Sequence, residues 1–168
     1  MCRTCDLEEI EQRWVVKMEY VDGETLAQRV ARVGRLDVPK ALAIARQIAE
    51  GLGAAHERGV VHRDLKPHNV LLEAATGRVV LMDFGLARMA ELAGHTAEGI
   101  AGTPEFMAPE QARGREVDGR ADLSLGCVLY YMLAGEIVFP AKGAMAAALR
   151  HVEDPAPDVR AKRPDVPA

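Results

Sequence analysis

Residues 62–69 read His-Arg-Asp-Leu-Lys-Pro-His-Asn, and this stretch decides the fold. It places the carboxylate of Asp64 two residues before the amine of Lys66, and it ends in the amide of Asn69. Asp64 could simply cap a helix. However, Pro67 disfavours a helical conformation of the residue before it, so we expect a constrained loop that projects Asp64 and Lys66.

Two further motifs follow in a fixed order. Asp83-Phe84-Gly85 begins fourteen residues after Asn69, and Ala108-Pro109-Glu110 comes later. Transfer of a phosphoryl group needs a carboxylate beside the acceptor hydroxyl, a cation near the phosphate and hard oxygen ligands for magnesium. Asp64, Lys66 and the pair Asn69 and Asp83 supply these groups. Each motif alone is weak, but three in this order are unlikely to arise by chance in an ordinary helical domain.

Together the motifs resemble those of eukaryotic-like serine/threonine protein kinases, in particular the bacterial Hanks-type branch. The resemblance runs from about residue 14 to residue 168 and implies an α+β, mostly helical, protein-kinase-like fold. In that fold the chain is the C-terminal lobe with the hinge, and the small lobe is missing. Residues 1–24 match the last small-lobe strands and hinge, residues 25–153 the large lobe with its catalytic loop and activation segment, and residues 154–168 a proline-rich tail, expected to be an extended loop.

The resemblance implies roles for the catalytic-loop residues. Asp64 is expected to orient the acceptor hydroxyl and take its proton, while Lys66 offsets charge on the phosphoryl oxygens and marks serine/threonine specificity. The implied cofactors are ATP and Mg²⁺, with Mn²⁺ as an alternative. Asn69 and Asp83 are the expected metal ligands, because they offer a neutral and an anionic oxygen.

By the same resemblance, the nucleotide lies at the hinge. The backbones of Glu19 and Val21 are expected to bind the adenine edge, Met18 is the gatekeeper, and Leu71 completes the nucleotide-binding set together with the two metal ligands. The simpler alternative is that these residues form a strand and turn of some other sheet, which would have a similar sequence. No Gly-x-Gly-x-x-Gly loop occurs, and Lys17 adjoins the hinge too closely to be the family's phosphate-pairing lysine.

The segment from Asp83 to Glu110 is rich in alanine and glycine and resembles the activation segment. Its hydroxyl groups belong to Thr96 and Thr103. Thr103 is expected to bond the catalytic aspartate and lysine, which leaves Thr96 as the candidate phosphosite. Arg63 is expected to receive that phosphate through its fork of donors. The simpler alternatives are that Thr96 is an unmodified threonine in a solvated loop and that Arg63 is only a surface charge.

Periodicity predicts three structural elements around these motifs. Asp37 is a plausible N-cap for an amphipathic helix that runs towards Gly59. Residues 70–72 and 79–82 are short β runs that suit a hairpin, which would bring Asn69 and Asp83 together. Residues 127–133 are almost uniformly apolar, which predicts a helix buried on most sides.

One interval departs from the family pattern. The family has four residues between the aspartate and the glycine that open its central helix, whereas three separate Asp122 from Gly126 here. Removing one residue from a helix rotates its two parts by about 100° relative to each other. We therefore expect Asp122 to be displaced from the catalytic-loop backbone that it normally holds.

Composition narrows the class of protein. The 168 residues are 49% hydrophobic, enough for one core, and the net charge of −4 argues against a nucleic-acid partner. There is no apolar run of about eighteen residues and no basic-then-apolar leader, so no membrane segment is expected and the predicted location is cytoplasmic. Cys2 and Cys5 are best regarded as incidental thiols.

The sequence thus predicts a fragment of an ATP-dependent serine/threonine kinase domain with little or no activity by itself. Its expected partners are a protein substrate with a serine or threonine acceptor, and a small-lobe or other partner domain. Two alternatives remain: a pseudokinase-like binding or scaffold module, and a truncated gene product.

Overall fold

The computed structural model describes residues 4–10, 13–84, 103–113, 115 and 117–167. Within this part of the chain, helices contain more residues than strands, in agreement with the mostly helical prediction. The α-helices are α1 (Leu26–Val33), α2 (Val38–His56), α4 (Pro109–Ala112), α5 (Leu125–Ala134) and α6 (Ala144–Glu153). The strands are β1 (Thr4–Ile10), β2 (Arg13–Met18), β3 (Gly23–Thr25), β4 (Val70–Glu73) and β5 (Val79–Leu81). Short 3₁₀ helices are η1 (Pro67–Asn69), η2 (Pro104–Phe106), η3 (Gly119–Ser124) and η4 (Val159–Ala161).

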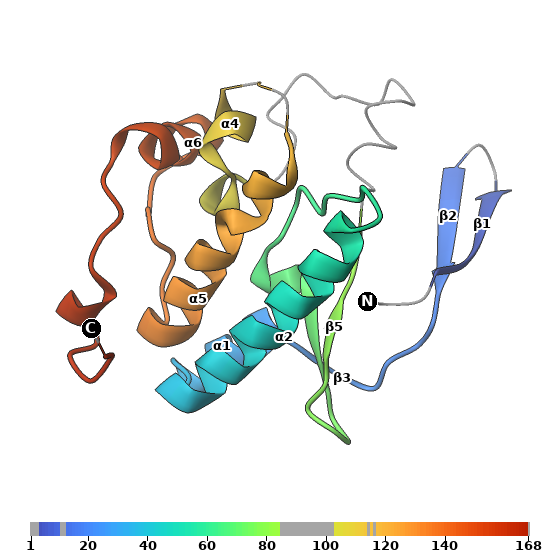
Figure 1. The fold of residues 1–168 in the computed structure, drawn as a ribbon, viewed down its shortest axis with the longest axis horizontal. Helices are drawn as coiled ribbons and strands as arrows, with labels where there is room; N and C mark the ends of the chain where they lie inside the picture. The colour runs from blue at the N-terminus through green and yellow to red at the C-terminus, as the bar shows by residue number, and fades with distance from the viewer. Residues whose placement is uncertain (1–3, 11–12, 85–102, 114, 116, 168) are drawn as a thin grey trace.

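The strands form two antiparallel sheets. β1 and β2 make a hairpin that stands apart from the helices, while β3, β4 and β5 form a sheet in that order beside α2 (Figure 1). In the second sheet Thr25 lies opposite Leu71, and Val70 lies opposite Leu81. The predicted hairpin from residue 70 to residue 82 is therefore confirmed, and β3 pairs with β4 along its other edge.

Helix α2 begins where the sequence predicts. The side chain of Asp37 accepts a hydrogen bond from the backbone N–H of Lys40 at 3.1 Å, which satisfies one of the free donors of the first turn. One face of α2 is buried against α5 and β5 (Figure 1), as the periodicity of its apolar residues requires. The fully buried residues Ile48, Val128 and Met132 belong to this shared core.

Most of the tail is irregular chain, but it is not only an extended loop. It contains η4, and the guanidinium of Arg163 is buried. Arg163 donates to the backbone carbonyl oxygens of Leu36, between α1 and α2, and of Leu133, in the last turn of α5. The carbonyl group of Leu133 lies at a helix C-terminus, where it lacks a partner within the helix, so the buried Nη1 of Arg163 satisfies it and, with its bond to Leu36, fixes the tail to the core.

None of the helices in the described part of the chain is both long enough and apolar enough to cross a membrane.

Candidate active site

Asp64, Lys66 and Thr103 form a closed triangle of hydrogen bonds. The ammonium of Lys66 lies 2.6 Å from Oδ2 of Asp64 and donates to the hydroxyl of Thr103 at 2.7 Å. That hydroxyl donates in turn to Oδ1 of Asp64 at 3.2 Å. Lys66 has extended backbone angles before Pro67, which agrees with the predicted loop. The resulting site holds a carboxylate, an amine and a hydroxyl in mutual contact.

Asn69 adds an oxygen donor to this cluster. Its amide nitrogen donates to the backbone oxygen of Asp64 at 2.9 Å and to Oδ2 at 3.3 Å, so its amide oxygen is the atom left to contact a cation. Asp83 follows Met82, whose N–H donates to the carbonyl oxygen of Asn69 at 2.9 Å. The β4–β5 hairpin therefore brings the backbones of Asn69 and Asp83 to the same end, and an amide oxygen with a carboxylate is the kind of donor pair that Mg²⁺ accepts.

Arg63 and Asp83 have left-handed backbone conformations, with φ of 67° and 61°. Residues other than glycine pay about 1–2 kcal/mol for this conformation, so surrounding contacts must hold them there. For Arg63 these contacts include its N–H bond to Oδ1 of Asp122 at 3.2 Å and the bond that its carbonyl oxygen accepts from Gln111 at 2.6 Å. Such strained residues cluster where a fixed geometry serves a function.

The predicted displacement of Asp122 is wrong. Its buried carboxylate accepts from the backbone N–H groups of His62 at 3.1 Å and Arg63 at 3.2 Å. The shortened interval begins in the 3₁₀ helix η3 and ends in the first turn of α5, and each residue of a 3₁₀ helix turns about 120° against about 100° in an α-helix. The tighter turn of η3 recovers part of the rotation that one deletion removes, and Asp122 still reaches the backbone of His62 and Arg63.

Two histidines support this arrangement. Nε2 of His56, at the end of α2, lies 2.7 Å from Oδ2 of Asp122, a contact that the sequence reasoning missed. The only sequence signal for this contact is that a histidine occupies the last turn of α2, a few residues before His62. His62 is fully buried, and its ring centroid lies 4.5 Å from that of Phe84. Burial lowers the pKa of His62, so its ring is neutral at pH 7.

The expected nucleotide-binding residues lie at the end of β2, in the connection that follows it, and in β4. Met18 ends β2 and is exposed, and Glu19 and Val21 belong to the irregular connection to β3. Leu71 is half-buried in β4, opposite Thr25 of β3. Pairing of β3 with β4 thus places Leu71 beside the chain that follows Val21. Lys17, which the sequence did not favour as a phosphate ligand, instead pairs with Glu8 of β1.

The candidate phosphosite, Thr96, lies outside the described residues. Thr103, in contrast, is described and contacts both Asp64 and Lys66.

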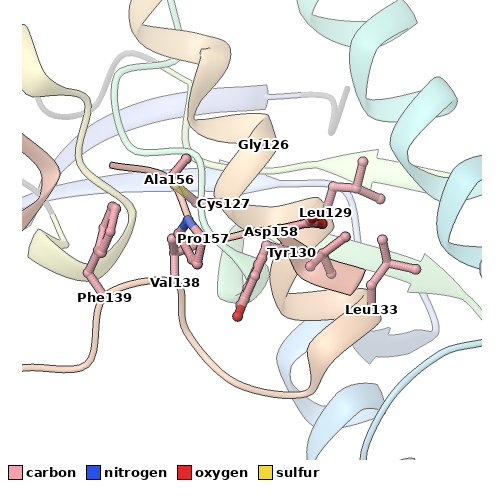
Figure 2. A pocket seen from close by; sticks show the side chains of 11 residues that line it. Gly126, Cys127, Leu129, Tyr130, Leu133, Val138, Phe139, Ala156, Pro157 and Asp158 are labelled. Atoms are coloured by element: carbon pink, nitrogen blue, oxygen red, sulfur yellow. The ribbon is translucent and has the colours of Figure 1, made fainter. Parts of the chain in front are cut away.

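A separate cavity of about 480 Å³ lies between α5 and the tail. Tyr130, Leu133, Phe139 and Pro157 are among the residues that line it (Figure 2). None of the described candidate catalytic residues contributes to its wall, which is mostly apolar. Burial also raises the pKa of its Cys127 thiol to about 11, so this cysteine is a poor nucleophile. We therefore assign no chemistry to this cavity.

Comparisons with known proteins agree with this geometry. The family described as "Protein kinase domain" matches residues 1–163. PknB of Mycobacterium tuberculosis is 41% identical over 147 residues, which cover 84% of this chain and 23% of PknB. PknD of the same species is 42% identical over 161 residues, which cover 95% of this chain and 24% of PknD. Pkn3 of Myxococcus xanthus is 37% identical over 163 residues, which cover 89% of this chain and 29% of Pkn3. All three are named serine/threonine-protein kinases.

Among solved structures, the kinase domain of M. tuberculosis PknI, crystallised as a double mutant, superimposes with a TM-score of 0.78 at 30% identity. The match covers 98% of this chain and 58% of that one. The chain thus spans less than a third of the length of the three curated relatives.

Proposed function

Because the chain belongs to the protein kinase family, with bacterial serine/threonine kinases among its relatives, we propose that it is the hinge and large lobe of a kinase catalytic domain. Residues 1–24 would then be the last small-lobe strands and hinge, residues 25–153 the large lobe, and residues 154–168 the tail before further helices. The small lobe would come from another segment or a partner domain. A cytoplasmic location is part of the same proposal.

The proposed reaction is transfer of a phosphoryl group from ATP to a serine or threonine hydroxyl of a protein substrate. The triangle of Asp64, Lys66 and Thr103 carries this proposal. It already holds one hydroxyl between a carboxylate and an ammonium. A substrate hydroxyl that takes a similar position would be oriented by Asp64, which accepts its proton, while Lys66 stabilises negative charge that develops on the phosphoryl oxygens.

Magnesium and ATP would supply the transferable group and neutralise its charge. The amide oxygen of Asn69 and the carboxylate of Asp83 would hold the metal. Met18, Glu19 and Val21 would contact the adenine, with Leu71 packed nearby. Arg63 and Thr96 would form a regulatory pair, in which a phosphate on the threonine docks on the guanidinium.

We expect the isolated chain to transfer phosphate far more slowly than a complete kinase domain. Positioning and electrostatic clamping of the phosphates supply most of the rate in this chemistry. The sequence lacks the Gly-rich loop that covers the phosphates. Joining a relative's small lobe to the N-terminus should therefore raise the rate.

The test uses the chain alone and the chain fused to the small lobe of PknB. Labelling of a generic protein acceptor from γ-labelled ATP is measured with magnesium and with EDTA. Asp64→Asn keeps the shape of the side chain but removes the base, so it should abolish labelling by the fusion. Asp118→Asn, at an exposed carboxylate that pairs with Arg120, is the control and should leave labelling unchanged.

A fusion that binds ATP but gives no labelling above the Asp64→Asn background would favour the scaffold alternative. Equal labelling by the fusion and its Asp64→Asn variant would refute the role of this carboxylate as base.

A further inference from the structure

Gln111 bridges the first turn of α4 and the catalytic loop. Its side-chain oxygen accepts from the backbone N–H of Ala108 at 3.1 Å, and its side-chain nitrogen donates to the carbonyl oxygen of Arg63 at 2.6 Å. The first partner can only donate and the second can only accept, so one orientation of the amide satisfies both. The two bonded segments are 48 residues apart in sequence.

The carbonyl oxygen that Gln111 binds belongs to the peptide group between Arg63 and Asp64. The N–H at the other end of this peptide faces Nδ1 of His62 at 3.4 Å, a long and weak contact. Asp122 holds the preceding N–H, that of Arg63. At 2.6 Å the bond from Gln111 is shorter than this contact, so it is the stronger of the two on the peptide that leads into Asp64.

The orientation of this peptide plane sets the direction in which the Asp64 side chain leaves the backbone. Arg63 reaches it through a left-handed conformation that is unfavourable for an arginine, so an unrestrained peptide would tend to rotate. A donor on the Arg63 carbonyl opposes that rotation.

We infer that Gln111 is a positioning residue, which fixes the Arg63–Asp64 peptide and thereby aims the Asp64 carboxylate. This inference rests on the proposed function only in so far as that carboxylate acts as the base. Gln111 and Thr103 both lie in the segment 103–113, so they connect this segment to the catalytic loop at two points, one on the side chain of Asp64 and one on the peptide before it.

Gln111→Glu tests the inference, because it separates the two bonds of the amide. A carboxylate still accepts from Ala108, but it cannot donate to Arg63 and repels its carbonyl oxygen. The chain offers a matched control in Gln28, which sits in the first turn of α1 and accepts from the N–H of Thr25 at 2.8 Å. Gln28→Glu therefore makes the same chemical change at another helix N-terminus.

The primary measurement is amide hydrogen exchange of Arg63 and Asp64 in the 168-residue chain, followed by NMR, and it requires no activity. We expect Gln111→Glu to speed exchange at these amides by about tenfold, the factor for loss of one hydrogen bond of ordinary strength. Gln28→Glu should change it less than twofold. Equal exchange in the two variants would overturn the inference. If Gln111→Glu fails to fold, Gln111→Met and Gln28→Met provide the same comparison.

The second measurement is phosphate transfer by the fusion with the PknB small lobe. Gln111→Glu should lower kcat about tenfold and leave the KM for ATP unchanged, because the nucleotide contacts are elsewhere. A changed KM with unchanged kcat would contradict the positioning role. If even the unmodified fusion transfers no phosphate, the proposed function fails, whereas the exchange comparison still decides whether Gln111 holds the peptide.

Discussion

Replacing Asp122 with asparagine should destabilise the protein by about 2–4 kcal/mol. The carboxylate is 2% exposed and has three partners: the N–H groups of His62 and Arg63, and the ring of His56. Hydrogen bonds to a charged group contribute about 1.5–3 kcal/mol each. Asparagine keeps the shape but has one acceptor oxygen, and its NH₂ group must face at least one backbone N–H. One buried backbone N–H then has no acceptor, and the remaining partners bond to a neutral amide in place of a carboxylate.

Urea unfolding followed by circular dichroism measures this loss as a change in the free energy of unfolding. Asp118→Asn is the control, because that carboxylate is 58% exposed and pairs with Arg120 on the surface, where an ion pair contributes about 0–1 kcal/mol. If Asp122→Asn costs less than about 0.5 kcal/mol with an unchanged denaturant slope, the carboxylate does not anchor the loop and the reasoning fails.

Three further outcomes are expected. Gly135→Ala should cost at least about 2 kcal/mol more in urea unfolding than Gly59→Ala, because both glycines have left-handed φ but only at Gly135 would a Cβ lie 2.3 Å from a backbone oxygen; equal costs would contradict the clash. Burial lowers the pKa of His151, so the unfolded chain binds a proton first as the pH falls below about 6.5 and stability declines towards pH 5. His151→Gln keeps a donor for the carbonyl oxygen of Glu105 and should flatten that decline in thermal melts; an unchanged slope would contradict it. Alkylation of Cys127 by iodoacetamide at pH 8, followed by mass spectrometry of its peptide, should be at least about tenfold slower than that of free cysteine, and a comparable rate would contradict the raised pKa.

Local patterns predicted much of the fold. The cap at Asp37, the apolar repeat of α2, the hairpin of β4 and β5, and the buried helix α5 all depend on neighbours within a few residues. The contact of Thr103 with Asp64 and Lys66 was anticipated only through resemblance to a family, since 37 and 39 residues separate these partners. No periodicity or propensity connects such positions.

The errors and omissions have physical reasons. The prediction for Asp122 assumed α-helical rotation, and a short sequence does not distinguish an α-helix from the tighter 3₁₀ turn of η3. Gln111 reads locally as a helix-capping residue, and its bond to Arg63 depends on how two distant segments pack. Arg163 reads as part of a proline-rich loop, although packing buries it.

The bond from Arg163 to the carbonyl oxygen of Leu36 also bears on the order of folding, because it closes a loop of 127 residues. Contacts between positions so far apart form late, since the entropy of loop closure must be offset by structure already in place. During synthesis at about 5–20 residues per second, Leu36 is made about 6–25 seconds before Arg163. The entropy of loop closure therefore favours assembly of the core around α2 and α5 before the tail is fixed to it.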